Sequence, residues 1–166
     1  MRRSIIVVAV VLAAGFGGGR SDFSGTWKLD KKMSKNLPTS FKMVSDFSLE
    51  VAQSADSMVT TTSFSGMGGA NKLPPTIVKF DGAEVYREDT ARGTKKWISG
   101  TWTTTGQKLL VTSRVTQRTM SGAEQKYTET DSWQFGKHNT LLIIQTKKFE
   151  PGDSTVSDER YFKRAD

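Results

Sequence analysis

Residues 126–135, Lys-Tyr-Thr-Glu-Thr-Asp-Ser-Trp-Gln-Phe, alternate between two sets of side chains along their whole length. In an extended chain, successive side chains point to opposite faces, so every second residue shares a face. One of these faces carries Tyr127, Glu129, Asp131, Trp133 and Phe135. The alternation predicts a β-strand with one face toward a core, in a sheet that other strands must complete.

The same period of two recurs on both sides of this stretch, and turn-forming residues such as Asp81-Gly82 and Pro151-Gly152 separate the alternating segments. No segment after Ser21 carries an apolar stripe at helical spacing. One alternating segment contains Phe41, Met43, Phe47, Leu49 and Val51. The candidate strands are residues 23–30, 41–52, 57–65, 76–80, 84–89, 95–104, 107–118, 124–135, 139–149 and 155–164.

Consecutive strands joined by short turns predict an up-and-down antiparallel β-barrel of about 8–10 strands, because closure removes the exposed edges of an open sheet. Residues 66–75 are interpreted either as a loop at the mouth of the barrel or as a disordered connector. Gly100, between Trp97 and Trp102, is a candidate for a β-bulge that would exchange the inward and outward faces of its strand.

The first candidate strand, Phe23-Ser24-Gly25-Thr26-Trp27-Lys28-Leu29-Asp30, resembles the Gly-x-Trp strand that opens the calycins, the lipocalins and fatty-acid-binding proteins. Residues 160–163, Arg-Tyr-Phe-Lys, are similar to the closing strand of those barrels, and small exported bacterial proteins with a Gly-Thr-Trp-Lys-Leu opening are similar too. The resemblance implies a lipocalin-like fold in which Gly25 and Trp27 are structural. It also implies an arginine over the face of Trp27, with Arg160 as the first candidate and Arg164 as the second.

Two features depart from the fatty-acid-binding proteins. Residues 31–40, with Pro38 among them, are too few for the two lid helices of that family. Glu159 stands two residues before Tyr161, where the family has the arginine of an Arg-x-Tyr pair that holds a ligand carboxylate. Carboxylate binding by that route is therefore not expected.

Residues 1–19 have the order of a secretory signal peptide: Arg2-Arg3, then the ten apolar residues from Ile5 to Ala14, then small residues. Such a run is too short to span a hydrocarbon core of about 30 Å, so cleavage is expected in preference to a permanent anchor. The predicted product, residues 20–166, is one exported domain in the periplasm or outside the cell, without stable membrane insertion.

The composition excludes several kinds of chemistry. The chain has no cysteine, so disulfides, thiolate metal sites and the lipidated cysteine of a bacterial lipoprotein are ruled out. His138 is the only histidine, so neither a transition-metal site nor a cofactor is expected. The net charge is +7, and about +5 without Arg2 and Arg3, but the basic residues are scattered. Nucleic-acid binding is therefore not expected. The protein is also expected to be a monomer.

The sequence favours binding of a small apolar or amphipathic ligand inside the barrel. The candidate lining residues are Phe47, Leu49, Val51, Val111, Tyr127 and Trp133. Glu129 and Asp131 could fix a cationic ligand, pair with Arg114 or Arg160, or act as the carboxylate pair of an enzyme, and no catalytic residue is assigned. The alternative functions are an envelope structural or interaction module with a filled core and, after it, a lipocalin-like enzyme.

Overall fold

The computed structural model describes residues 19–66 and 68–165, so residues 1–18 of the predicted signal peptide lie outside it. No helix in this described part is long and apolar enough to cross a bilayer. The elements in chain order are β1 (Gly25–Leu29), α1 (Thr39–Lys42), β2 (Val44–Gln53), β3 (Ser57–Gly66), β4 (Gly69–Lys72), β5 (Thr76–Lys79), β6 (Val85–Asp89), β7 (Thr94–Trp102), β8 (Leu109–Arg118), β9 (Glu124–Phe135), η1 (Lys137–Asn139), β10 (Leu141–Glu150) and β11 (Thr155–Arg164).

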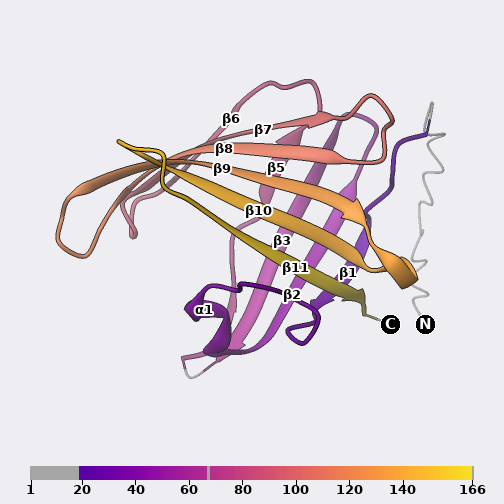
Figure 1. Cartoon of the computed structure of the whole chain (residues 1–166), viewed down its shortest axis with the longest axis horizontal. Helices are drawn as coiled ribbons and strands as arrows, with labels where there is room; N and C mark the ends of the chain where they lie inside the picture. Colours follow the sequence, from indigo (N-terminus) through magenta and orange to yellow (C-terminus); the bar gives the residue numbers. More distant parts are fainter. Residues whose placement is uncertain (1–18, 67, 166) are drawn as a thin grey trace, which may run out of the picture.

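The eleven strands form one antiparallel sheet, which confirms the all-β expectation. Their order is β4-β3-β2-β1-β11-β10-β9-β8-β7-β6, with β5 also beside β3. Strand β1 pairs with β11, where Trp27 lies opposite Arg164. Figure 1 shows strands β8–β11 crossing over β2, β3 and β5, so the sheet curls into two facing layers.

Residues 66–75 were interpreted from the sequence as a loop at the barrel mouth or as a disordered connector. Both interpretations are wrong for Gly69–Lys72, which form strand β4. Strand β4 pairs with the second half of β3, β5 pairs with the first half, and the Leu73 amide donates to Thr62 O between them. Pro74 and Pro75 lack amide hydrogens and interrupt the ladder there. Strands β4 and β5 are therefore one bent strand along β3.

The hydrogen-bonded ladder is not closed, because its path ends at β3's partners on one side and at β6 on the other. Short contacts nevertheless bring these edges together. The Gly82 amide donates to Gly100 O at 3.2 Å, and Arg87 on β6 donates through Nη1 to Thr76 Oγ1 on β5 at 2.5 Å. The two edges thus lie side by side and are joined by a few polar contacts.

Aromatic side chains fill one end of the space between the layers. This cluster, which we call the aromatic plug, consists of Phe23, Trp27, Trp102 and Phe135, with the Phe23 ring centre 5.8 Å from Trp102 and 5.2 Å from Phe135. Trp27 is fully buried, and its indole Nε1 donates to Phe23 O at 2.9 Å. The plug closes this end, and the β6–β7, β8–β9 and β10–β11 turns mark the opposite, open end (Figure 1).

Arg164, the second candidate, covers Trp27, with its guanidinium carbon 4.7 Å from the ring centre. The first candidate, Arg160, is wrong for this role. The register explains the difference: Arg164 lies directly opposite Trp27, whereas Arg160 is four residues nearer the open end, about 13 Å along an extended strand.

Gly100 does not mark a bulge, because the β7–β8 register runs through it without a shift. Its missing side chain instead makes room for β5. A Cβ at this position would lie 2.6 Å from Val78 Cγ1 and 2.9 Å from Lys79 O. Glycine therefore lets β5 approach β7 where the ladder is interrupted.

Gly100→Ala is expected to lower the free energy of unfolding by about 1–3 kcal/mol, because the added methyl group overpacks this contact. Urea unfolding followed by circular dichroism measures the change. Gly68→Ala is the control, since a Cβ there meets no atom within 4 Å. Equal losses in the two variants would contradict the close approach of β5 to β7.

The strand predicted to begin at residue 41 begins later, at Val44. Pro38 precedes the single turn α1, and a register shift between Val44 and Asp46 follows it. Phe41 lies on α1 and packs against Phe47 with ring centres 5.0 Å apart, while Met43 is 64% exposed. Helix α1 therefore lies beside the open end of the space between the layers.

Candidate functional site

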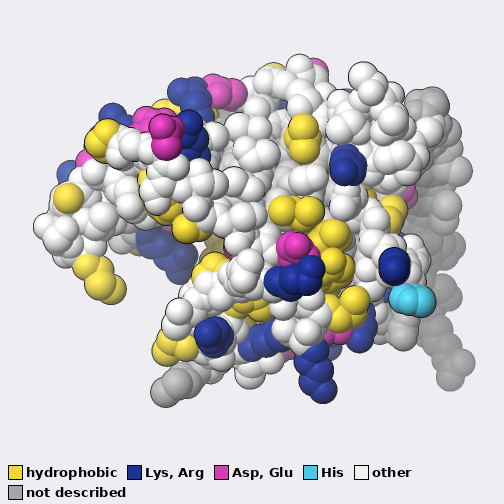
Figure 2. All heavy atoms as spheres, in the orientation of Figure 1, with side chains coloured by type: hydrophobic (Ala, Val, Ile, Leu, Met, Phe, Trp, Pro, Cys, Tyr) yellow, Lys and Arg dark blue, Asp and Glu magenta, His cyan; other side chains and the backbone are white. Residues whose placement is uncertain are grey.

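An interior cavity of about 200 Å³ lies between the two layers, above the aromatic plug. Strands from both layers supply its walls. Its apolar floor consists of Leu49, Ile98, Val111, Trp133, Ile143 and Phe162. Its polar lining includes six side chains that we call the polar ring: Lys96, Ser113, Glu129, Asp131, Gln145 and Arg160. Figure 2 shows the surface hollowed between the projecting hairpin tips and the part of the molecule that carries α1.

Along β9 and β10, the order of the apolar and polar lining residues follows from strand alternation and register. Along the inner face of β9, Trp133, Asp131 and Glu129 succeed one another from the aromatic plug toward the open end. On β10, Ile143 lies opposite Trp133, Gln145 opposite Asp131, and Lys147 opposite Glu129. Because directly opposite residues share a face, an apolar, a polar and a charged pair succeed one another along β9 and β10. On the flanking strands apolar and polar residues interleave, since Arg160 lies opposite Ile143 and Val111 lies opposite Asp131.

Glu129 is a buried carboxylate held by two lysines. Its Oε1 lies 2.9 Å from Lys96 Nζ, and its Oε2 lies 3.2 Å from Lys147 Nζ. Burial acts to raise the pKa of Glu129, but the two ammonium groups outweigh it and hold the pKa below its usual value. The ion pairs join strands β7, β9 and β10, and neither of the predicted arginine partners takes part.

The two arginines have other partners. Arg114 pairs with Glu84 through Nη2 and Oε2 at 2.7 Å, outside the cavity. Arg160 donates to Asp158 from Nε at 2.6 Å and from Nη2 at 3.0 Å, and Nη2 also donates to Gln145 Oε1 at 2.5 Å. Its guanidinium carbon lies 4.8 Å from the centre of the Phe41 ring. Arg160 therefore belongs to the polar ring and links it to α1.

Asp131 differs from Glu129, the other acid of the polar ring, because no cationic group of the described residues lies within ion-pair distance of it. Its Oδ1 accepts a hydrogen bond from Gln145 Nε2 at 2.9 Å. Burial, assisted by the nearby charge of Glu129, raises the pKa of Asp131 to about 6. At neutral pH, Asp131 is thus a mostly ionised carboxylate on the cavity wall with one neutral donor.

Four of the six predicted lining residues line the cavity: Phe47, Leu49, Val111 and Trp133. Val51 is buried in the core but outside the cavity lining. Tyr127 lies nearer the open end, where its ring centre is 5.5 Å from that of Phe149 and 5.2 Å from Lys147 Nζ. Burial raises the pKa of Tyr127 to about 12. Val51 and Tyr127 therefore do not line the cavity.

Most of the polar ring was not predicted from the sequence to line the cavity, namely Lys96, Ser113, Gln145 and Arg160. For Gln145 a signal was present, since it continues the alternation of Leu141 and Ile143 along one face. The indole Nε1 of Trp133 is a further polar group at the cavity. It is buried, and no acceptor among the described protein atoms is within hydrogen-bond distance.

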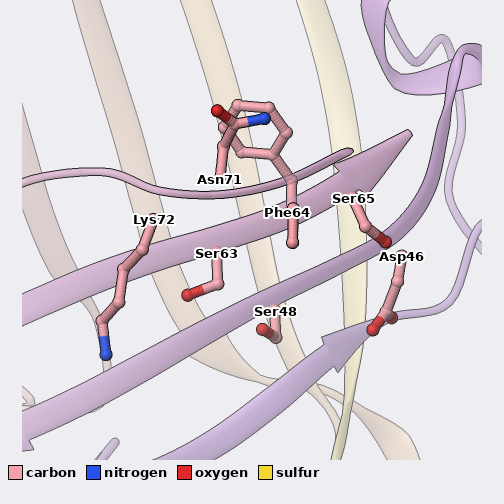
Figure 3. A pocket seen from close by; sticks show the side chains of 8 residues that line it. Asp46, Ser48, Ser63, Phe64, Ser65, Asn71 and Lys72 are labelled. Atoms are coloured by element: carbon pink, nitrogen blue, oxygen red, sulfur yellow. The ribbon is translucent and has the colours of Figure 1, made fainter. Parts of the chain in front are cut away.

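A second hollow, of about 400 Å³, lies on the outer face of β2, β3 and β4. Figure 3 shows Ser48, Ser63 and Asp46 on one side of these strands, whereas Phe64 and Asn71 point to the other side. Lys72 is 62% exposed and pairs with Glu50, which is 53% exposed. Short, solvated side chains make this hollow a weaker candidate than the interior cavity.

No group of three or more acidic or histidine side chains within residues 19–66 and 68–165 is arranged to hold a metal ion. No family model matches the chain, and no curated protein matches its sequence. The interior cavity and its lining are therefore the features from which a function can be inferred.

Proposed function

We propose that the protein is an exported, lipocalin-like barrel that binds a small amphipathic molecule between its two layers. One observation carries this proposal: the interior cavity is lined both by apolar side chains, among them Trp133 next to the aromatic plug, and by the side chains of the polar ring. A ligand with an apolar part and a polar group matches this lining. The Gly-x-Trp opening strand and the predicted signal peptide are consistent with an exported calycin.

Contacts that join the free edges of the sheet support the interpretation of the fold as a barrel. Asp81 forms an isolated bridge with Thr101 beside β7, next to the hydrogen bond from Gly82 to Gly100. Arg87 reaches from β6 to Thr76 and to the carbonyl of Pro74. These contacts bring the free edges at β5 and β6 together without closing the ladder.

The cavity volume limits the size of the ligand. The cavity of about 200 Å³ is a little larger than an engineered cavity of about 150 Å³ that binds benzene. It is smaller than the roughly 300–1,000 Å³ usual for sites that hold drug-sized molecules. We therefore infer a ligand with one ring or a short chain and one polar group, and not a long acyl chain enclosed along its whole length.

The test is calorimetric titration with 2-phenylethanol, which has one ring and one neutral polar group. We expect saturable binding with a dissociation constant below about 1 mM, which corresponds to about −4 kcal/mol. Thr62→Phe should weaken it at least tenfold, because Thr62 lines the cavity. Thr61→Phe is the matched control, since Thr61 is the neighbour of Thr62 on β3 and its side chain points to the opposite face of the sheet.

The competing function is an envelope interaction module with no interior ligand. It predicts no saturable binding, up to about 10 mM, of 2-phenylethanol or of its amine and carboxylate analogues, or equal binding in both threonine variants, which would indicate a surface site. Either result overturns the proposed function. Circular dichroism of each variant establishes that the sheet is retained before the titrations are compared.

A further inference from the structure

Lys147 and Asp158 each pair with a member of the polar ring. With these two included, the polar ring contains three cationic and three acidic side chains. Lys96 and Lys147 share Glu129 at 2.9 and 3.2 Å, and Arg160 binds Asp158. Each of these cations is therefore already held by a carboxylate. An anionic ligand would have to break one of these buried pairs, at a large cost.

Asp131 is the charged group of the ring that a ligand can still engage directly. Its hydrogen-bond donor is the neutral amide of Gln145, at 2.9 Å. The charged groups that face it are Glu129 on its own strand, Lys96 on β7 and Arg160 on β11. The two cations donate their short hydrogen bonds to other acids, Lys96 to Glu129 and Arg160 to Asp158. A carboxylate in a poorly hydrated cavity is stabilised most by a cation brought to it.

We infer that the ligand is a small protonated amine, whose ammonium group binds the Asp131 carboxylate while its apolar part lies on the floor formed by Trp133, Ile143 and Phe162. This inference rests on the proposed function, because it names the chemical class of the molecule in the same cavity. Trp133 lies two residues from Asp131 on the same face, so the carboxylate and the apolar floor are adjacent. A compact ligand can contact both.

The experiment compares three probes of nearly equal size at pH 7.5: 2-phenylethylamine, 2-phenylethanol and phenylacetate. We expect the amine to bind at least about tenfold more tightly than the alcohol, the lower end of what a charge-assisted hydrogen bond contributes. Phenylacetate should bind more weakly than the alcohol, because it meets Asp131 with a like charge.

Two variants separate Asp131 from the general charge of the protein. Asp131→Asn should reduce the affinity for the amine at least about tenfold, to that for the alcohol in the same variant. Asp46→Asn removes the same charge from the outer face of β2 and should leave all affinities unchanged. In the wild-type protein, the affinity for the amine should fall as the pH drops below about 6, since protonation removes the charge of Asp131.

The outcomes distinguish the two proposals. Equal binding of amine and alcohol, or tighter binding of phenylacetate, overturns the inference of an amine and leaves the cavity as a ligand site. An unchanged affinity of Asp131→Asn for the amine overturns it as well. Failure of all three probes to bind overturns the proposed function itself, and the inference of an amine with it.

Discussion

Trp27→Ala is expected to lower the free energy of unfolding by about 3–5 kcal/mol, the range for removing a large, fully buried aromatic side chain. Trp27 has no exposed surface, packs on Phe135 with ring centres 6.1 Å apart, and lies under the guanidinium of Arg164. The variant leaves a cavity in the aromatic plug and removes the donor to Phe23 O. Its neighbours come from β9, from β11 and from the segment before β1, so they cannot collapse into the space without disturbing β1 and β11.

Trp97→Ala is the matched control for this loss. Trp97 lies on β7, partly exposed, with Tyr86 at 5.2 Å on one side and the Arg114 guanidinium at 5.5 Å on the other. Partly exposed positions tolerate truncation better, so we expect a loss of about 1 kcal/mol. Urea unfolding gives both values. Similar losses in the two variants would contradict the view that the plug holds the closed end together.

The long strands were predictable from sequence because their alternation extends over ten or more residues. Strands β9 and β11 begin and end where the pattern predicts, at residues 124–135 and 155–164. The pattern failed where tertiary contacts decide the local structure. Strand β4, Gly-Ala-Asn-Lys, is exposed and has weak strand propensity, and it is a strand because it continues the ladder along β3.

The beginning of β2 shows the opposite failure. Phe41 and Met43 continue the alternation in sequence, yet Pro38 and the shift between Val44 and Asp46 place them outside the strand. Alternation reports which residues share a face only where the chain stays extended without interruption. The same limit applies to the arginine over Trp27, since the choice between Arg160 and Arg164 depends on register between the first and last strands.

The candidate site was half predictable for a related reason. Phe47, Leu49, Val111 and Trp133 are apolar residues on alternating strands, so burial and lining follow from the same pattern. The polar ring does not follow from it, because Lys96 and Gln145 are read as surface residues until their partners are known. Glu129 and Gln145 lie inside because carboxylates and donors from other strands satisfy them there.

Asp131→Asn is expected to raise the free energy of unfolding at pH 7.5 by about 2–3 kcal/mol. The pKa of Asp131 in the folded protein is raised to about 6 from an ordinary value of 3.8. Each pKa unit corresponds to about 1.4 kcal/mol, so keeping this group ionised costs the fold about 3 kcal/mol. Asparagine never carries that charge, and its side-chain oxygen can still accept the hydrogen bond from Gln145.

The sign of the pH dependence follows from the direction of the shift. Because the folded-state pKa lies above the unfolded-state pKa, the contribution of Asp131 to stability is fully present below about pH 4 and is lost as the pH rises through about 6. The difference between Asp131→Asn and the wild type should therefore be near zero at pH 4 and reach its plateau above pH 7. Urea unfolding at a series of pH values measures it.

Asp46→Asn should show no such rise, because Asp46 is exposed on the outer face of β2. A pH-independent difference for Asp131→Asn would mean that the carboxylate is not desolvated in the fold, and it would remove the reason for a cation to bind there. A gain that grows with pH, and that shrinks when saturating 2-phenylethylamine stabilises the wild type more than the variant, would link the charge of Asp131 to ligand binding. The buried charge that lowers stability is then the group that binds the ligand, which is the exchange of stability for function expected at a binding site.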